Sequence, residues 1–377
     1  MTTRALATPT ERVDVIPTAT VAVPAGMESI AAQLPTAGCA VVPAGPGGAW
    51  RALADGNRTV ILPDVSVELG GRRYFLSAKG VGALAPLYGD SPLDVVDPDG
   101  DDPATVRDFT GEAWFGEAPF GAQGEINARL ACDLTALTAG RAELHGFAIC
   151  PVVAVVEVPH ERVAAGAARW WYRRWRGPWL QEQRLVPSDV RLFHASDRTL
   201  GRSPDLVLEE FGVRDGPALD AFVDRYLASG IAAVTLFART LKRVPWGVHG
   251  LDFEHVWLDK DSVVAPDGTL CFADLEGVDW ALAGQDRSVE YRVREQLEHN
   301  LYELMYGLDA LVRVAERRAC RRATQAERRR SVANRVELAL ARDPFVRTER
   351  GTDHLDLVVH PAAGLADLIR FRLLDLG

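Results

Sequence analysis

Short runs of β-forming residues, separated by turn residues, occupy the chain from about residue 40 to residue 80. The segments CAVVPAG, TVILPDVSVELG and RRYFLSAKG are rich in Val, Ile, Tyr and Phe and are bounded by Gly, Pro or Asp. The pair Gly70-Gly71 between the last two predicts a hairpin turn. Further along, FAICPVVAVVEVP is a continuous apolar run typical of a buried strand. This part of the chain is therefore predicted to be β-rich.

Helical periodicity appears first in the segment GEINARLACDLTALTA. Its apolar residues recur along one face of a helix, at Ile126, Leu130, Leu134 and Leu137. From about residue 204 the pattern is mainly helical, with ALDAFVDRYLASG and IAAVTLFARTLKRV as amphipathic segments. Residues 286–345 are again helical in pattern and rich in Arg. We therefore expect an α+β protein.

The order of these patterns predicts how the chain is divided. Residues 1–20 are rich in Thr and Pro and are expected to form a flexible tail. Residues 21–160 are expected to form a β-rich N-lobe, and residues 161–377 a mainly helical C-lobe. An acidic, Pro- and Gly-rich stretch at about 89–110 is expected to be a surface insertion in the N-lobe.

Charge and cysteine content narrow the classes of function. With 42 Lys and Arg against 52 Asp and Glu, the net charge of −10 disfavours binding along a nucleic-acid backbone. The five cysteines contain no C-x-x-C pair, so neither a disulfide framework nor a zinc site is indicated. No apolar run is long enough to cross a bilayer, and no signal peptide is apparent. We expect a cytoplasmic protein without a membrane or nucleic-acid partner.

Lys79 is the first candidate for chemistry. It ends a predicted strand and is followed by Gly80 and Gly82, which would let the backbone approach phosphates but would equally suit simple turns. A Lys in a half-buried strand needs a partner for its ammonium group. In nucleotide sites the phosphates are that partner, and a helix Glu holds the Lys. Glu125, at the start of the predicted helix, is a plausible Glu of this kind, whereas the simpler reading of Lys79 is a strand-end residue without function.

Two polar segments in the C-terminal half form the second candidate. They are WGVHGLDFEHVWL, residues 246–258, and LCFADLEGVDW, residues 270–280. An Asp that follows an apolar strand and precedes a Gly is a usual metal ligand in kinase-like enzymes, and Asp274 fits this form. The alternative is a buried Asp that caps a turn.

Taken in chain order, these segments resemble the selenoprotein O family, kinase-like proteins that transfer AMP to protein hydroxyls. The resemblance covers roughly residues 40 to 285. It includes AKGVGALAPLYGD, QGEINARLACDLTAL, HGFAICPVVAVVEVP, RLVPSDVR and the pair HG and ADLEG. In RLVPSDVR, Arg184 and Arg191 have the spacing of two family arginines that contact the phosphates. The resemblance implies a bilobal protein-kinase-like fold that binds ATP and Mg²⁺, with the phosphates held by Lys79, Glu125 and the two arginines.

The catalytic-type loop departs from the family pattern. Counting from its His-Gly pair, the positions of the family's base and metal-binding Asn hold His255 and Val256. Val cannot bind Mg²⁺, which prefers oxygen ligands. We expect Asp252 or His255 to take the catalytic role, with Glu254 as a neighbouring alternative, and His255 to join Asp274 at the metal. A His can act as a base because its unperturbed pKa lies near neutrality.

The sequence thus predicts an ATP-dependent nucleotidyltransferase that moves AMP to a hydroxyl of a protein or peptide. Two alternatives stay open. Phosphoryl transfer to a small molecule, as in aminoglycoside-kinase-like enzymes, is compatible with the HG and DLEG segments. A pseudokinase that binds nucleotide without catalysis is favoured by Val256.

Overall fold

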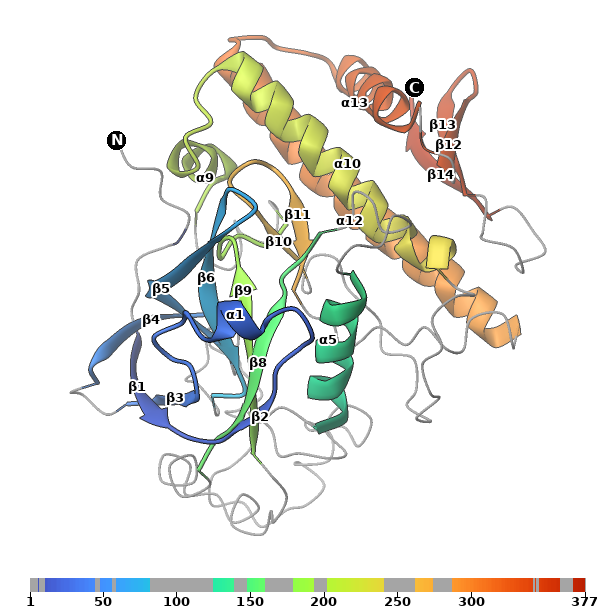
Figure 1. Ribbon diagram of the computed structural model, residues 1–377. Coiled ribbons are helices and arrows are strands. Elements are labelled where there is room, and N and C mark those ends of the chain that lie inside the picture. Colours follow the sequence, from blue (N-terminus) through green and yellow to red (C-terminus); the bar gives the residue numbers. More distant parts are fainter. Residues whose placement is uncertain are drawn as a thin grey trace, which may run out of the picture. The chain divides into compact units, whose positions relative to one another are not determined.

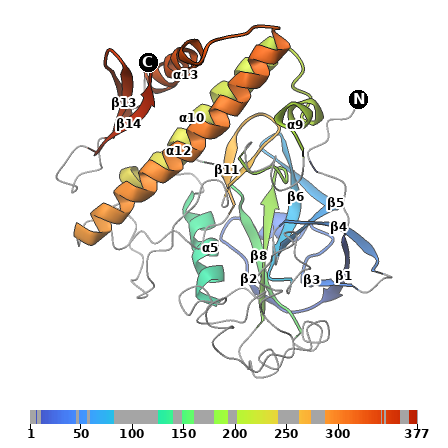
Figure 2. The ribbon, with the colours of Figure 1, turned by 180° about the vertical axis from the view of Figure 1, so that it is seen from behind.

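A computed structural model describes the greater part of the chain. The described residues are 6, 11–44, 48–55, 59–81, 125–138, 148–159, 179–192, 202–240, 262–273, 287–341, 343, 346–359 and 369–376. They form a mixed α+β protein with a large curled β-sheet and several helices (Figure 1; Figure 2 gives the view from behind). The chain divides into a sheet unit, residues 6–140 and 150–189, and a helical unit, residues 1–5, 141–149 and 190–377. None of the described helices is long and apolar enough to cross a membrane.

The sheet unit is built on an eight-stranded antiparallel sheet with the strand order β2-β8-β9-β6-β5-β4-β1-β3. Its strands are β1 (Glu11–Pro17), β2 (Thr20–Ala22), β3 (Cys39–Pro43), β4 (Trp50–Ala54), β5 (Thr59–Leu69), β6 (Arg72–Lys79), β8 (Val152–Glu157) and β9 (Leu180–Val186). The described part of the unit also contains the short helix α1 (Glu28–Ala31) and the helix α5 (Glu125–Thr138).

The hairpin predicted from Gly70-Gly71 is confirmed. β5 and β6 pair antiparallel on either side of these glycines, whose φ angles are +57° and +76°. A two-residue hairpin turn of this kind needs positive φ at both positions, which glycine adopts without steric cost. Nothing lies within 4 Å of where a Cβ would stand at either position, so the conformation rather than lack of space requires glycine.

The predicted ends of the β-rich part need correction. The flexible tail expected over residues 1–20 is wrong for Glu11–Pro17, which form β1 between β4 and β3. Val13 and Val15 alternate with polar residues there, and Val13 is buried in the core. The predicted boundary at residue 160 is also too early, because β9 belongs to the sheet unit, which continues to Asp189.

The run FAICPVVAVVEVP forms two strands rather than the single strand predicted. β7 (Ala148–Ile149) pairs with β11 of the helical unit, whereas β8 lies in the eight-stranded sheet. The chain leaves strand conformation at Cys150 and Pro151. Proline has no N–H to donate to a ladder and is rare inside central strands, which explains a break at this point.

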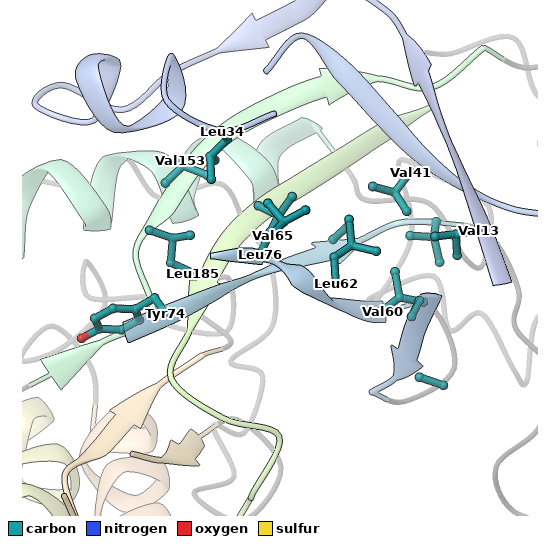
Figure 3. Close-up of a cluster of buried hydrophobic side chains, with 14 residues drawn as sticks. Val13, Leu34, Val41, Val60, Leu62, Val65, Tyr74, Leu76, Val153 and Leu185 are labelled. Carbon is teal, nitrogen blue, oxygen red and sulfur yellow. The ribbon is translucent and has the colours of Figure 1, made fainter. Parts of the chain in front are cut away.

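The core of the sheet unit shows how strongly the sheet curls (Figure 3). Val41 of the edge strand β3 lies in the same buried cluster as Val153 of β8 and Leu185 of β9. These strands stand at opposite ends of the strand order, so only a sheet that folds over itself can bring their side chains together. Leu62 and Leu76 fill the space between them and are fully buried.

Two buried glutamines of β9 form hydrogen bonds to the backbone of β3 and so stabilise the curled sheet. Gln181 accepts a hydrogen bond from the Val41 N–H at 2.9 Å, and its Nε2 donates to the Val41 carbonyl at 2.6 Å. Gln183 Nε2 donates to the Cys39 carbonyl at 2.7 Å. The glutamine side chains therefore satisfy backbone groups on β3 that would otherwise be unpaired in the interior.

The described residues of the helical unit form helices and short strands. The helices are α9 (Pro204–Glu210), α10 (Gly216–Thr240), α12 (Arg287–Arg318) and α13 (Gln325–Leu340). The strands are β7, β10 (Ser262–Val264), β11 (Leu270–Phe272), β12 (Val346–Arg350), β13 (His354–Val359) and β14 (Ile369–Asp375). The two amphipathic segments after residue 216 form one continuous helix, α10, and the Arg-rich stretch forms α12 and α13.

Helices α10 and α12 lie side by side along their length (Figures 1 and 2). Glycines allow this close approach. A Cβ at Gly230 of α10 would stand 2.3 Å from Leu304 Cδ1, and one at Gly307 of α12 would stand within 2.2 Å of the Tyr226 hydroxyl oxygen. Burial, and then the charge of Glu303, raise the pKa of Tyr226, so this phenol stays protonated.

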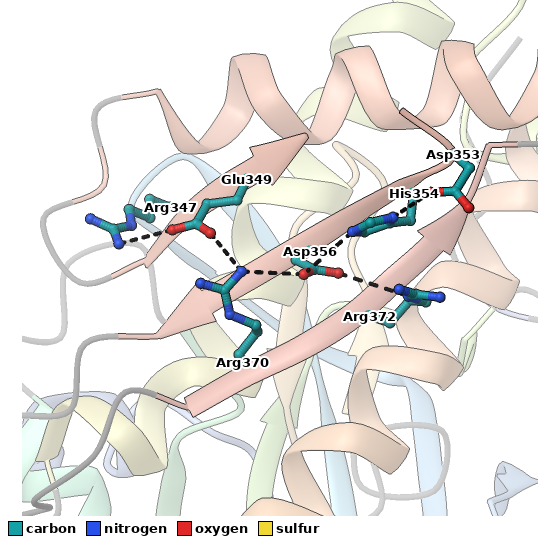
Figure 4. Close-up of polar contacts among 7 residues, drawn as sticks. All are labelled: Arg347, Glu349, Asp353, His354, Asp356, Arg370 and Arg372. Atoms are coloured by element: carbon teal, nitrogen blue, oxygen red, sulfur yellow. Dashed lines mark hydrogen bonds and ion pairs between the residues drawn. The ribbon is translucent and has the colours of Figure 1, made fainter. Parts of the chain in front are cut away.

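The C-terminal strands β12, β13 and β14 form a small antiparallel sheet that the sequence patterns did not predict. Charged side chains cover one face of it (Figure 4). Asp356 lies at the centre, 3.3 Å from Arg370 Nη1 and 3.7 Å from His354 Nε2. Arg370 also pairs with Glu349 at 2.6 Å. Since these charges pair with one another, we interpret this face as a solvated surface rather than a binding site.

Candidate functional site

Four polar side chains lie together on one face of β6 and β9. Ser77 and Lys79 of β6 stand directly opposite Arg184 and Glu182 of β9. Residues in direct register on antiparallel strands project to the same face, and so do residues two apart on one strand. The four are at most 3% exposed. We call this set (Ser77, Lys79, Glu182 and Arg184) the charged strand face.

The charged strand face carries more positive than negative charge. Arg184 Nη1 lies 3.6 Å from Glu182 Oε1, while Lys79 adds a second cation on the neighbouring strand. Buried charges are costly unless they are paired, so side chains of this kind are rare at such depth and are often functional. Ser77 Oγ is also fully buried, with no hydrogen-bond partner among the described residues. These groups suit an anionic ligand with polar oxygens, such as a phosphate.

Helix α5 lies against β8 and β9 (Figure 1). Its described buried residues are Ala128, Ala131, Cys132 and Thr135. Their spacing places them on one helix face, whereas the side chains of the predicted apolar face at Ile126, Leu130, Leu134 and Leu137 lie outside the described set. Thr135 Oγ1 accepts from the Val152 N–H at 3.1 Å and donates to the Ala131 carbonyl at 2.9 Å, which ties the helix to β8.

Cys132 lies on the buried face of α5. Its pKa is raised to about 12, first by burial and then by the negative charges of Glu182 and Asp133. Helix α5 also contacts β9, the strand that carries Glu182. A thiol with this pKa stays neutral at physiological pH, so Cys132 is a packing residue rather than a nucleophile.

The backbone that follows Lys79 is held in place by a tryptophan. Gly80 has φ of +97°, a conformation that favours glycine, and its carbonyl accepts a hydrogen bond from Trp179 Nε1 at 3.1 Å. Trp179 is 2% exposed. The end of β6 is therefore anchored to the start of β9, the same strand that supplies Glu182 and Arg184.

Glu125 begins α5, as predicted, but its contacts are within the helix. Its carboxylate accepts hydrogen bonds from Arg129 Nε at 3.0 Å and Arg129 Nη2 at 2.7 Å, and its side chain is 47% exposed. The carboxylate in register with Lys79 is Glu182. A pairing of Glu125 with Lys79 therefore stays a prediction. The sequence did contain a signal for Glu182, because four consecutive polar residues interrupt the apolar strand LQEQRLV.

The two predicted phosphate arginines belong to different units. Arg184 is in β9 of the sheet unit, whereas Arg191 belongs to the helical unit and is partly exposed. The residue before it, Val190, accepts a hydrogen bond from the Val264 N–H of β10 at 2.6 Å. The segment that carries Arg191 is therefore attached to the hairpin of β10 and β11.

That hairpin is fixed on helix α10. Ser229 Oγ accepts a hydrogen bond from the Leu270 N–H at 2.8 Å. The hairpin turn contains Gly268, with φ of +94°, and a Cβ there would lie 2.3 Å from the Phe222 carbonyl oxygen. β11 ends at Phe272, just before the predicted metal ligand Asp274 in the sequence.

Part of the predicted site falls outside the described residues, namely Gly82, Asp252, His255 and Asp274. Within the part of the chain that the structure describes, no group of His, Cys, Asp and Glu side chains could hold a metal ion. The predicted Mg²⁺ site therefore depends on Asp274 and the catalytic-type loop and stays a prediction.

A hollow of about 600 Å³ lies among α10, α12 and α13 and contains none of the predicted site residues. Its lining includes Arg335, which pairs with Asp220 and, at 3.1 Å, with Asp224. It also includes Glu316, which pairs with Arg328 at 2.9 Å. Because these charges satisfy one another, the hollow offers a weaker case for an anionic ligand than the charged strand face does.

Comparison with known proteins adds no assignment: no protein-family model matches the chain, and no curated protein matches it.

Proposed function

We propose that this chain binds ATP through the charged strand face and transfers AMP to a hydroxyl of a protein or peptide. The observation that carries the proposal is the burial of Lys79 and Arg184 on one face of two neighbouring strands. Phosphate groups bind to positioned cations and hydrogen-bond donors, and a buried site strengthens each such interaction. The fully buried Ser77 hydroxyl adds a donor at the same place.

The order of elements supports a bilobal kinase-like arrangement. A strand that ends in a Lys is followed by a helix on the same sheet, and then by a helical unit with a hairpin just before Asp274. Kinase-like enzymes use this order to combine a phosphate-binding Lys with a metal-binding Asp. The same order supports Asp274 and His255 as holders of Mg²⁺, which when bound would neutralise charge on the phosphates.

In the proposed reaction, AMP passes directly from ATP to the acceptor, without a covalent intermediate on the protein. The acceptor oxygen forms a bond to the α-phosphorus of ATP, and the bond from that phosphorus to the bridging oxygen breaks, which releases pyrophosphate. Asp252 or His255 takes the proton of the acceptor hydroxyl. Lys79, Arg184 and Arg191 hold the phosphate oxygens and stabilise the charge that develops on them.

Transfer of label from ATP tests the proposal. The protein is incubated with Mg²⁺, Ser-, Thr- and Tyr-containing peptides, and ATP labelled on either the α- or the γ-phosphate. We expect label to pass from the α-position to the protein or a peptide, with release of pyrophosphate. Label from the γ-position alone would instead support phosphoryl transfer. No transfer, together with a nucleotide-induced rise in melting temperature, would support a pseudokinase.

Variants locate the site. Lys79→Ala should abolish nucleotide binding or transfer, and full ATP affinity in this variant would refute the assignment. Arg51→Ala is a matched control, because it also removes a cation from the sheet unit but from a side chain that is 56% exposed and pairs with Asp64. This control should bind ATP as the unmodified protein does.

A further inference from the structure

We infer that the helical unit binds an acidic peptide segment of a partner protein in a hollow bordered by α12, α13 and β14. The hollow has a volume of about 620 Å³ and contains none of the site residues predicted from the sequence. Its three elements contact one another within the helical unit (Figures 1 and 2). The inference concerns peptide binding alone and holds whether or not the chain transfers AMP.

Two exposed tyrosines of α12 line this hollow, which we call the tyrosine hollow. Tyr302 is 65% exposed and Tyr306 is 49% exposed, and they are the aromatic side chains among the exposed large hydrophobics of the described residues. They lie one helical turn apart, with ring centroids 6.4 Å from each other. Exposed apolar side chains that occur singly need no explanation, whereas neighbouring ones beside a hollow indicate an interaction site.

Apolar side chains from all three elements complete the lining of the tyrosine hollow. They are Met305, Val332, Leu373 and Leu374. Leu373 and Leu374 are consecutive in β14 and would point to opposite faces of a regular strand. The register of β13 and β14 shifts here and leaves Leu373 as an extra residue between the paired Arg372 and Leu374. Such a bulge redirects a side chain, which explains how both leucines border one hollow.

The charged residues that line the tyrosine hollow are mainly positive. They are Arg313, Arg328 and Arg329, with Asp309 as the acidic residue among the described ones, although the whole chain carries a net charge of −10. Arg313 donates through Nε to Asp309 at 2.7 Å, and Arg328 donates through Nε and Nη2 to Glu316 at 3.0 and 2.9 Å. A guanidinium has five N–H donors, so each of these paired arginines can also donate to a carboxylate of a partner. The excess of arginine is complementary to an acidic partner.

The composition of the tyrosine hollow is that of a protein interface. Interfaces are enriched in aromatic residues, Met and Arg and depleted in Lys, Asp, Glu, Ser and Ala. Six of the eleven described lining residues are Tyr, Met or Arg, and one belongs to the depleted types. In the hollow among α10, α12 and α13, four of sixteen are of the enriched types and eight are of the depleted types. The two hollows are similar in volume, so composition rather than size distinguishes them.

A peptide segment suits the tyrosine hollow better than a small molecule does. Small-molecule sites enclose about 70–90% of the ligand surface, whereas the tyrosines here remain largely open to solvent. Tyr and Arg are also the residues that contribute most to binding at protein interfaces. A segment with an aromatic or large apolar side chain flanked by Asp or Glu would cover the tyrosines and place its carboxylates beside the arginines.

Selection of random peptides displayed on phage tests this inference, with the full-length protein immobilised and no nucleotide present. We expect the enriched peptides to carry an aromatic or large apolar residue next to Asp or Glu. The affinity of an enriched peptide is then measured by fluorescence polarisation. If no peptide is enriched, or if the enriched peptides are basic, the inference is overturned.

Variants locate the bound peptide. Tyr302→Ala should weaken binding about tenfold, as is typical of an interface residue of this type. Arg313→Gln should weaken it about threefold, and by less at high salt, because its charge is exposed and screened. Both side chains are mostly exposed, so the midpoint of urea unfolding should change little in either variant.

Two matched controls lie outside the tyrosine hollow. Leu338→Ala removes an apolar side chain of α13 that is 76% exposed. Arg317→Gln removes a cation of α12 whose side chain is 56% exposed, as is that of Arg313, and which also pairs with an Asp. Both controls should bind the peptide as the unmodified protein does. If they weaken binding as much as Tyr302→Ala and Arg313→Gln do, the peptide binds elsewhere and the inference is overturned.

A second copy of this chain is the competing occupant of the tyrosine hollow. It would produce concentration-dependent dimers in analytical ultracentrifugation that Tyr302→Ala abolishes, with no peptide enriched, and this result would also overturn the inference. Because peptide binding is measured without ATP, a failure of the proposed nucleotide transfer leaves the test unaffected.

Discussion

Replacing Gln181 with leucine tests whether a side chain of β9 holds the curled sheet together. The substitution keeps an apolar group of similar size in a fully buried position but removes both hydrogen bonds to Val41, at 2.9 and 2.6 Å. The N–H and the carbonyl of Val41 then have no partner in the interior. We therefore expect β3 to detach from β9.

The expected size of the effect follows from these two groups. Leaving a buried polar group unsatisfied costs about 1–3 kcal/mol, so two groups cost about 2–6 kcal/mol. Burial of the leucine offsets about 1–2 kcal/mol of this. The net loss in the free energy of unfolding should be about 0–5 kcal/mol, with a central value of about 2.5 kcal/mol. Gln183→Leu, which removes a single bond to the Cys39 carbonyl, should cost about half as much.

Urea unfolding and hydrogen exchange together measure this loss. Unfolding gives the change in stability, and exchange followed by mass spectrometry reports on the amides of residues 39–43. Faster exchange in this segment is expected for Gln181→Leu. The control is Gln33→Leu, because Gln33 makes an exposed bond to Ser29 and its removal should cost less than about 0.5 kcal/mol. If Gln181→Leu is no more destabilising than this control, the glutamine does not hold the sheet closed.

Three further predictions follow from other contacts. Gly268→Ala should destabilise the helical unit by about 2–5 kcal/mol in thermal or urea unfolding, because φ is +94° and the new Cβ would meet the Phe222 carbonyl at 2.3 Å. A hydrogen bond from Arg350 lowers the pKa of Glu337, so its contribution to stability is present above pH 4.5 and is lost as pH falls through the lowered pKa. Cys132, with its raised pKa and buried thiol, should resist iodoacetamide at pH 8, as measured by peptide mass spectrometry.

Each of these predictions has a matched control. Gly216→Ala, at a position with nothing within 4 Å of the new Cβ, should leave stability nearly unchanged. Glu337→Gln should show a weaker loss of stability on acidification than the unmodified protein, and equal slopes would contradict the role of Arg350. Cys320 is exposed and should be alkylated first. Labelling of Cys132 at the same rate would mean that the face of α5 that carries it is not buried.

Local sequence patterns predicted helices and strands correctly where the residues of a segment favour a single backbone conformation. The strands over residues 59–69 and 72–79 follow from β-forming residues, and the turn between them follows from Gly70-Gly71. Helix α5 begins at Glu125, where helical periodicity begins in the sequence. The prediction of a single strand for the run FAICPVVAVVEVP was wrong. The chain pairs with one sheet before Pro151 and with a different sheet after it.

The candidate site was only partly predictable. Lys79 was singled out because a Lys at the end of an apolar strand is unusual, and the structure buries it. The sequence indicated Glu125 as its partner, because the periodicity of apolar residues locates the start of the helix. Glu182 was missed, since its relation to Lys79 depends on the register of two strands about a hundred residues apart, which no local pattern encodes.

The sequence by itself determined the α+β class, the β5–β6 hairpin and the helical nature of the region after residue 204, because periodicity and turn conformation act over a few residues. Tertiary structure decided the meaning of the polar run Gln181–Arg184. Alternation along β9 sends its glutamines to the β3 backbone and Glu182 and Arg184 to the charged strand face. Only the pairing with β6 and the curl of the sheet make both faces interior, and both arise from contacts between distant segments.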